Sequence, residues 1–116
     1  GKTPYRVSGV IGDKAGQLAA ALRGDGTSPA TVEFARMKAY TARVRNQTSQ
    51  EFAAATASGD RMALRQIPGV VAIGGGVPIR AGSETIGAIG VSGAPGGDKD
   101  EICAQAGIAT VAAGLN

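Results

Sequence analysis

The chain opens with two short apolar runs in which hydrophobic and polar positions alternate at a period close to two. Tyr5, Val7 and the Val10-Ile11 pair mark the first run, and a second run follows at residues 17–23. Residues 12–16, between the runs, are typical turn residues. Alternation interrupted by a turn predicts an opening β-hairpin.

Between residues 29 and 45 the apolar positions recur at spacings of three and four, the period of an amphipathic α-helix. Ser28 is a favourable N-cap, and Pro29 suits the first helical position, where its missing N–H costs nothing. We predict a helix over residues 29–45 that packs a wide apolar stripe on a sheet. The stripe consists of Val32, Phe34, Ala35, Met37, Ala39, Tyr40, Ala42 and Val44.

The pattern then changes from helical to strand-like. Residues 48–51 resemble the start of a second helix, and residues 61–66 suit a further short helical turn. Three short strands are predicted at residues 70–73, 77–80 and 85–92. Their connections are too short for parallel crossovers, so these strands are expected to be antiparallel neighbours.

The last segment predicts a helix made almost entirely of small and apolar residues. Asp98 is a good N-cap, and Glu101 three residues later completes a capping-box pattern before residues 102–115. Small side chains allow such a helix to approach the sheet or another subunit closely. Strands with two long helices make the fold α+β, around an antiparallel sheet.

The composition points to a single domain with a small core. The chain has 116 residues, which suits one hydrophobic core and leaves no room for a second domain. Hydrophobic residues make up 43% but aromatic residues only 3%, so Ala, Val, Ile and Leu must fill the core. Because association buries surface that so small a core leaves exposed, we expect a homo-oligomer.

Charge and cysteine content exclude several classes of function. The net charge is +3, but the basic residues are scattered and aromatic stacking partners are few, which argues against nucleic-acid binding. With Cys103 as the single cysteine and no histidine, neither an intramolecular disulfide nor a Cys/His zinc site can form. No apolar run is long enough to span a bilayer. A cytoplasmic location is slightly favoured, and an extracytoplasmic one stays open if a leader preceded Gly1.

One turn of the first long helix carries residue types that could transfer protons. Lys38, Tyr40 and Thr41 lie close together there, and Glu33 precedes Lys38 by five positions. Nothing in the sequence orients these groups. We therefore assign no catalytic residue and keep Lys38, Tyr40 and Glu33 as the set that an enzyme would use.

Two other features could meet a ligand. The glycines at residues 74–76, including Gly75 and Gly76, would let a flat ligand approach the backbone, although a bend between strands explains them equally well. Arg23 and Arg80 lie at predicted strand ends, where each could bind a carboxylate in bidentate fashion. Solvent-exposed arginines are the plainer alternative.

Two glycine-rich segments are the most specific motifs of the chain: Gly-Gly-Gly-Val-Pro-Ile-Arg at residues 74–80 and Gly-Val-Ser-Gly-Ala-Pro-Gly-Gly at residues 90–97. They resemble the GlcG/HbpS haem-binding family, whose domain also forms the C-terminal part of PduO-type adenosyltransferases. Further matching segments follow the family's order at residues 21–26, 35–42 and 100–104. The resemblance covers nearly the whole chain from Tyr5 onward.

The resemblance implies a profilin-like, five-stranded antiparallel sheet with helices on both faces, dimers or larger homo-oligomers, and haem as a ligand. The family's usual N-terminal helix has no counterpart before the first strand here. A histidine ligand to haem iron is impossible in this sequence. The conceivable iron ligands are Tyr5, Met37, Tyr40, Met62, Cys103, the hydroxyl of Thr41, or a lysine.

Three hypotheses for function follow. The first is a non-enzymatic domain that binds or senses a small molecule such as haem, with Arg23, Lys38 and Arg80 meeting an anionic group. The second is an enzyme of small organic acid metabolism with a pocket at a subunit interface. The third is a purely structural oligomerisation module.

Overall fold

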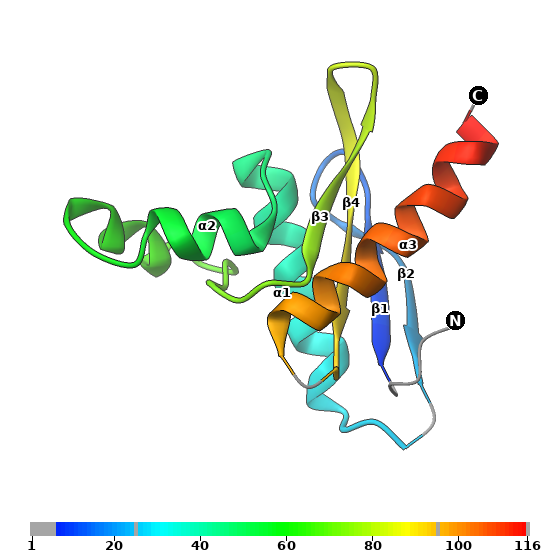
Figure 1. The fold of residues 1–116 in the computed structure, drawn as a ribbon, viewed down its shortest axis with the longest axis horizontal. Helices are drawn as coiled ribbons and strands as arrows, with labels where there is room; N and C mark the ends of the chain where they lie inside the picture. The colour runs from blue at the N-terminus through cyan, green and yellow to red at the C-terminus, as the bar shows by residue number, and fades with distance from the viewer. Residues whose placement is uncertain (1–6, 25, 95, 116) are drawn as a thin grey trace.

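The sheet consists of two hairpins that lie side by side. The computed structural model describes residues 7–24, 26–94 and 96–115. Within these residues the strands are β1 (Ser8–Gly12), β2 (Leu18–Arg23), β3 (Gly76–Ala81) and β4 (Glu84–Ser92). They pair antiparallel in the order β2-β1-β4-β3 (Figure 1). The opening hairpin and the antiparallel arrangement are confirmed, while Tyr5 lies outside the described residues.

The prediction of five strands is wrong, because the described residues form four. Residues 70–73, expected to be a strand, are irregular. The backbone N–H of Val70 donates to Ile67 O in a turn, and the N–H of Val71 donates to the Thr41 side chain, 2.9 Å away. These amide groups bond to a turn and to a helix side chain, so they do not pair with a neighbouring strand.

Two long helices cover opposite faces of the sheet. Helix α1 (Ala30–Arg45) lies on one face and helix α3 (Gly97–Leu115) on the other (Figure 1). The caps differ from those predicted. Pro29, not Ser28, is the N-cap of α1, and no side chain caps it. Helix α3 begins at Gly97, so Asp98 lies inside the first turn instead of capping it.

A helical arm extends sideways from the sheet (Figure 1). It contains α2 (Ser49–Ala55) and a 3-10 helix, η1 (Asp60–Gln66). The predicted start of α2 is confirmed as a capping box, in which the Thr48 side chain accepts from Glu51 N and the Glu51 carboxylate accepts from Thr48 N. The second helical turn is also confirmed, in the 3-10 form.

Small residues make up the core on both faces. Between α1 and the sheet the buried cluster is Val10, Ala35, Ala39, Ala42 and Ala88; between α3 and the sheet it is Val77, Val91 and Ala104. Of the wide stripe predicted on α1, the three alanines and Val32 belong to this core. Phe34 and Val44 are exposed, so the stripe is narrower than predicted.

The closest approach between helix and sheet occurs at Gly90. A Cβ atom at this position would lie 2.0 Å from Ala35 O and 2.8 Å from Ala39 N, both in the backbone of α1. Any larger residue would therefore separate α1 from β4. Gly90 is therefore required for α1 to pack on the sheet at this distance.

We expect Gly90→Ala to lower the free energy of unfolding by about 3 kcal/mol, because backbone atoms cannot yield to the added methyl group. Urea denaturation monitored by circular dichroism measures this loss. Gly9→Ala is the matched control, because its Cβ would meet nothing closer than Gly90 O at 4.0 Å. Equal losses in the two variants would contradict the proposed role of the close contact.

Candidate functional site

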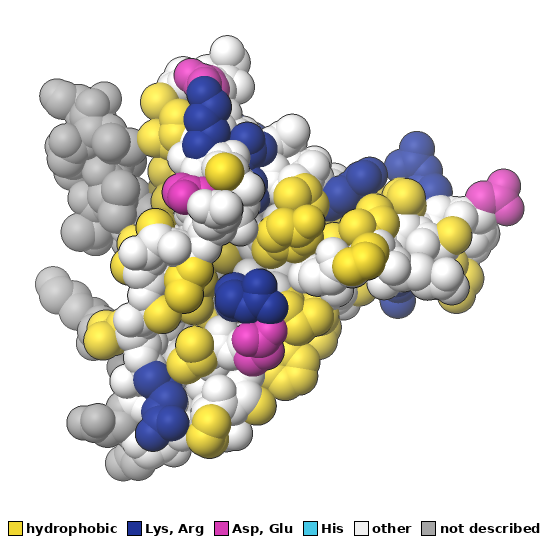
Figure 2. All heavy atoms as spheres, turned by 180° about the vertical axis from the view of Figure 1, so that it is seen from behind, with side chains coloured by type: hydrophobic (Ala, Val, Ile, Leu, Met, Phe, Trp, Pro, Cys, Tyr) yellow, Lys and Arg dark blue, Asp and Glu magenta, His cyan; other side chains and the backbone are white. Residues whose placement is uncertain are grey.

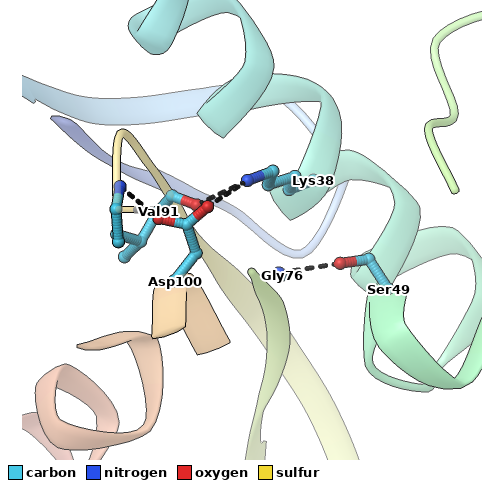
Figure 3. A network of polar contacts seen from close by, with 6 residues as sticks. Lys38, Ser49, Gly76, Val91 and Asp100 are labelled. Carbon is cyan, nitrogen blue, oxygen red and sulfur yellow. Dashed lines mark hydrogen bonds and ion pairs between the residues drawn. The ribbon is translucent and has the colours of Figure 1, made fainter. Parts of the chain in front are cut away.

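Lys38 is buried at the end of the sheet and pairs with Asp100 on the first turn of α3 (Figure 3). The Lys38 Nζ donates to Asp100 Oδ2 at 2.8 Å and to Val91 O at 3.0 Å. The two side chains are only 3% and 5% exposed. Asp100 Oδ1 accepts a further bond from Ala94 N at 2.9 Å. The pair is thus stabilised by hydrogen bonds on both sides, as a buried ion pair requires.

Two glycines enclose this ion pair. Gly75 has a φ of 131°, and a Cβ there would lie 2.5 Å from Val91 O and 2.8 Å from Lys38 Cδ. A Cβ at Gly76 would lie 2.1 Å from Lys38 O, and the Gly76 N–H donates to Ser49 Oγ at 2.8 Å (Figure 3). The glycines therefore bring protein backbone and the lysine together, and the space beside them is filled by the protein itself.

Thr41, one turn further along α1, is buried and already has two hydrogen bonds. Its hydroxyl donates to Met37 O at 2.7 Å and accepts from Val71 N at 2.9 Å. The structure thus gathers four of the six predicted ligand-binding residues in the interior, where each contacts protein atoms. These four are Lys38, Thr41, Gly75 and Gly76.

The three groups of the enzyme hypothesis do not meet. The Tyr40 ring packs beside the glycines of two loops, within 3.5 Å of a Cβ built at Gly16 and 3.1 Å of one built at Gly69. Glu33 is exposed and forms an ion pair with Arg36, which lowers the pKa of the Glu33 carboxyl through a hydrogen bond. Neither side chain shares the buried site of Lys38.

Arg80 and Arg23 lie in different surroundings. Arg80 lines an open cavity of about 390 Å³ between the two hairpin turns and the end of α1, whereas Arg23 is exposed at the end of the edge strand β2. Basic and acidic side chains gather at the tip of the β3–β4 hairpin, at the top of Figure 2. We call this cavity the hairpin pocket; its lining is Lys14, Arg43, Asn46, Arg80, Ser83, Glu84 and Thr85.

Asn46 holds the two arginines of the hairpin pocket. It is the C-cap of α1 and has a left-handed φ of 54°. Arg43 Nη1 donates to Asn46 Oδ1 at 3.3 Å, and Arg80 Nη2 donates to Asn46 O at 2.7 Å. Arg43 Nε also donates to Lys14 O at 2.6 Å, which ties the helix to the first hairpin turn.

Glu84 is the acidic side chain of the hairpin pocket. It forms an ion pair with Lys14, and the hydrogen bond from Lys14 is the main cause that lowers the pKa of the Glu84 carboxyl. The charge of Lys14 adds to this effect and that of Arg43 contributes least, against a small opposing effect of burial.

Donors for a metal are few in the described part of the chain. No group of three or more His, Cys, Asp or Glu side chains there is arranged to hold an ion. Of the conceivable haem ligands, Met62 is 50% exposed on η1 and Cys103 is half-buried on α3. Met37 is half-buried on α1, and Tyr5 lies outside the described residues.

A family model for HbpS-like, haem-degrading proteins matches residues 2–109. The chain belongs to this family. The resemblance inferred from the glycine-rich segments is therefore confirmed. No curated protein matches the chain. No helix in the described ranges is long and apolar enough to cross a membrane.

Solved structures of HbpS-like proteins share the fold. A double mutant of HbpS from Streptomyces reticuli is 39% identical with a TM-score of 0.87, over 91% of this chain and 71% of that one. The Klebsiella pneumoniae protein ORFY is 25% identical, with a TM-score of 0.82 over 88% and 72% of the two chains. The PduOC–haem complex is 25% identical, with a TM-score of 0.79 over 89% and 76%.

The partner of Lys38 in this HbpS-like domain was not predicted from the sequence. A signal for it existed, because Lys38 occupies the buried side of α1, three residues after Ala35 and four before Ala42. A lysine there needs an acidic partner. The choice of Asp100 among the acidic residues depended on the fold.

The hairpin pocket was also missed, apart from Arg80. Lys14, Arg43 and Asn46 come from a turn and a helix end that are distant from Arg80 in the sequence. Only the pairing of the strands and the packing of α1 bring them together.

We expect Lys38→Met to lower the free energy of unfolding by about 3–5 kcal/mol, because the buried Asp100 carboxylate loses its counterion. Adding Asp100→Asn should restore most of this loss, since the amide oxygen can still accept from Ala94 N. Urea denaturation of both variants measures the effect. If the double variant were no more stable than Lys38→Met, an unpaired Asp100 charge would not explain the loss.

The pKa of Glu84, measured by carboxyl NMR, should lie below its ordinary value and rise towards it in Lys14→Met. Because the pKa is lower in the folded state, the contribution to stability is present above the ordinary pKa and is lost as the pH falls through the lowered one. Arg36→Met is the control: it should raise the pKa of Glu33 and leave that of Glu84 unchanged. An unchanged Glu84 pKa in Lys14→Met would refute the ion pair.

Proposed function

We propose that the chain is a haem-binding domain that acts by binding or sensing and not by catalysis. The observation that carries the choice of ligand is membership of the HbpS-like, haem-degrading family over nearly the whole chain. The choice of binding over catalysis rests on the separate positions of Lys38, Tyr40 and Glu33. The likeness to PduOC, whose structure contains haem, supports the same ligand.

The donor set of this chain decides which groups can meet the iron. The sequence contains no histidine, so the ligand must be an oxygen or sulfur donor or a lysine amine. Lys38 Nζ is held by Asp100 and Val91, and the Thr41 hydroxyl is held by Met37 and Val71. Both groups would have to abandon buried hydrogen bonds to reach a ligand.

Tyr40 fits the iron better. Its side chain is half-buried and, among the described residues, no hydrogen bond to its hydroxyl is formed. A tyrosine oxygen is an established type of haem ligand. We therefore propose Tyr40 as the iron ligand, with the exposed thioether of Met62 as the next candidate.

Homo-oligomerisation forms part of the proposal. All six residues of the edge strand β2 are exposed, and they include Leu18 and Leu22. An exposed apolar edge strand favours association with another chain. The enzyme hypothesis receives less support, because Lys38 is already ion-paired and lies apart from Tyr40 and Glu33.

Titration with ferric haem should give a saturable change in the Soret band, with one haem per chain. Tyr40→Phe removes the hydroxyl and keeps the ring against Gly16 and Gly69, so it should change the Soret and electron paramagnetic resonance spectra and weaken binding by about tenfold or more. Met62→Leu is the matched control.

Two outcomes would contradict different parts of the proposal. A linear absorbance change without saturation in the unaltered protein would refute specific haem binding. Saturable binding with spectra unchanged in Tyr40→Phe but altered in Met62→Leu would move the iron ligand to η1.

A further inference from the structure

Two guanidinium groups share one anchor in the hairpin pocket. The side-chain oxygen of Asn46 accepts from Arg43 and its backbone oxygen accepts from Arg80. Asn46 adopts its left-handed conformation at the end of α1, which turns both oxygens to these neighbours. The two cations thus share one anchor and line the same pocket.

The charges of the hairpin pocket leave these two arginines without a counterion. Glu84 forms its ion pair with Lys14, so those two charges compensate each other. Neither Arg43 nor Arg80 forms an ion pair within the described residues. Arg43 affects Glu84 only as the weakest of the causes that act on its pKa. Two neighbouring cations repel each other, and a ligand with two negative charges relieves that repulsion.

The bonds that Arg43 and Arg80 form with Asn46 and Lys14 leave N–H donors on both guanidiniums for a ligand. Arg80 uses one N–H on Asn46, and Arg43 uses two, one on Asn46 and one on Lys14. Each guanidinium keeps further N–H donors in its planar fork. The pocket is open, with a volume of about 390 Å³, so it can admit the charged end of a larger molecule.

We propose that Arg43 and Arg80 form a clamp for a pair of carboxylates. This assignment rests on the proposed haem binding: the two carboxylates are the propionates of the tetrapyrrole. A free dicarboxylic acid presents the same chemistry and is the alternative source. Charge-assisted, bidentate hydrogen bonds from the two guanidiniums hold the carboxylates.

The test uses iron-free protoporphyrin IX, so that iron ligation contributes nothing. Its fluorescence is titrated with the full chain, with Arg43→Met/Arg80→Met, and with Arg36→Met. We expect the double variant to bind about tenfold or more weakly, and Arg36→Met to bind like the unaltered protein. Arg36 is the matched control, because it is also an exposed arginine, does not line the hairpin pocket and is already paired with Glu33.

The dimethyl ester of the porphyrin removes the carboxylate charges and should abolish the difference between the double variant and the unaltered protein. Arg80→Lys keeps the charge but loses the fork and should bind with intermediate affinity. Thermal unfolding of each variant shows whether the fold is retained. Equal affinity of the double variant and the unaltered protein for protoporphyrin would overturn the clamp, even if ferric haem binds elsewhere.

A titration with succinate distinguishes the tetrapyrrole propionates from a free dicarboxylic acid as the source of the two carboxylates. If the unaltered protein does not bind protoporphyrin but succinate saturably shifts the side-chain NMR signals of Arg43 and Arg80, the clamp stands with a free dicarboxylate as its ligand. The proposal of haem binding would then be refuted, and the clamp would not. If neither probe binds to the unaltered protein, the clamp is refuted.

Discussion

The buried ion pair between Lys38 and Asp100 is the interaction on which the rest of the structure depends. It joins the two long helices, which lie on opposite faces of the sheet, at the end of β4. Burying two charges is costly unless their remaining donors and acceptors are also bonded. Val91 O and Ala94 N provide these bonds. A lysine amine held in this way fixes how α1 and α3 are positioned relative to the sheet.

Close packing around that pair explains the unusual composition of the chain. The sequence contains 19 glycines, and those at Gly75, Gly76 and Gly90 lie where a Cβ would collide with backbone. The alanines of α1 continue the same contact along the helix. Layers this close leave little room for large side chains, so the core is thin and aromatic residues are few. Stability then depends on the fit of the backbone more than on the burial of bulky groups.

The buried ion pair and the hairpin pocket have different roles for different physical reasons. At the buried site, Lys38 and Asp100 compensate each other's charge and protein atoms fill the space beside them, as expected of a structural centre. In the hairpin pocket, Arg43 and Arg80 are held in place and lack a counterion, which is the condition of a binding site. The haem-related family and the two cations together favour an anionic tetrapyrrole as ligand. The buried ion pair of Lys38 holds α1 and α3 on the sheet that carries this pocket.

The sequence by itself determined the local structure and the family. Period-two and period-three-to-four patterns, together with the Thr48 and Glu51 capping box, located both hairpins and the helices, and the glycine-rich segments identified the HbpS-like domain. It did not determine that residues 70–73 stay irregular, because an apolar run looks the same whether its backbone pairs with a strand or bonds to a helix side chain such as Thr41. Nor could it pair Lys38 with Asp100 or gather Arg43 and Arg80 around Asn46. Those contacts join residues far apart in the chain, and local patterns carry no information about such distances; only the packing of α1 and α3 on the sheet decides them.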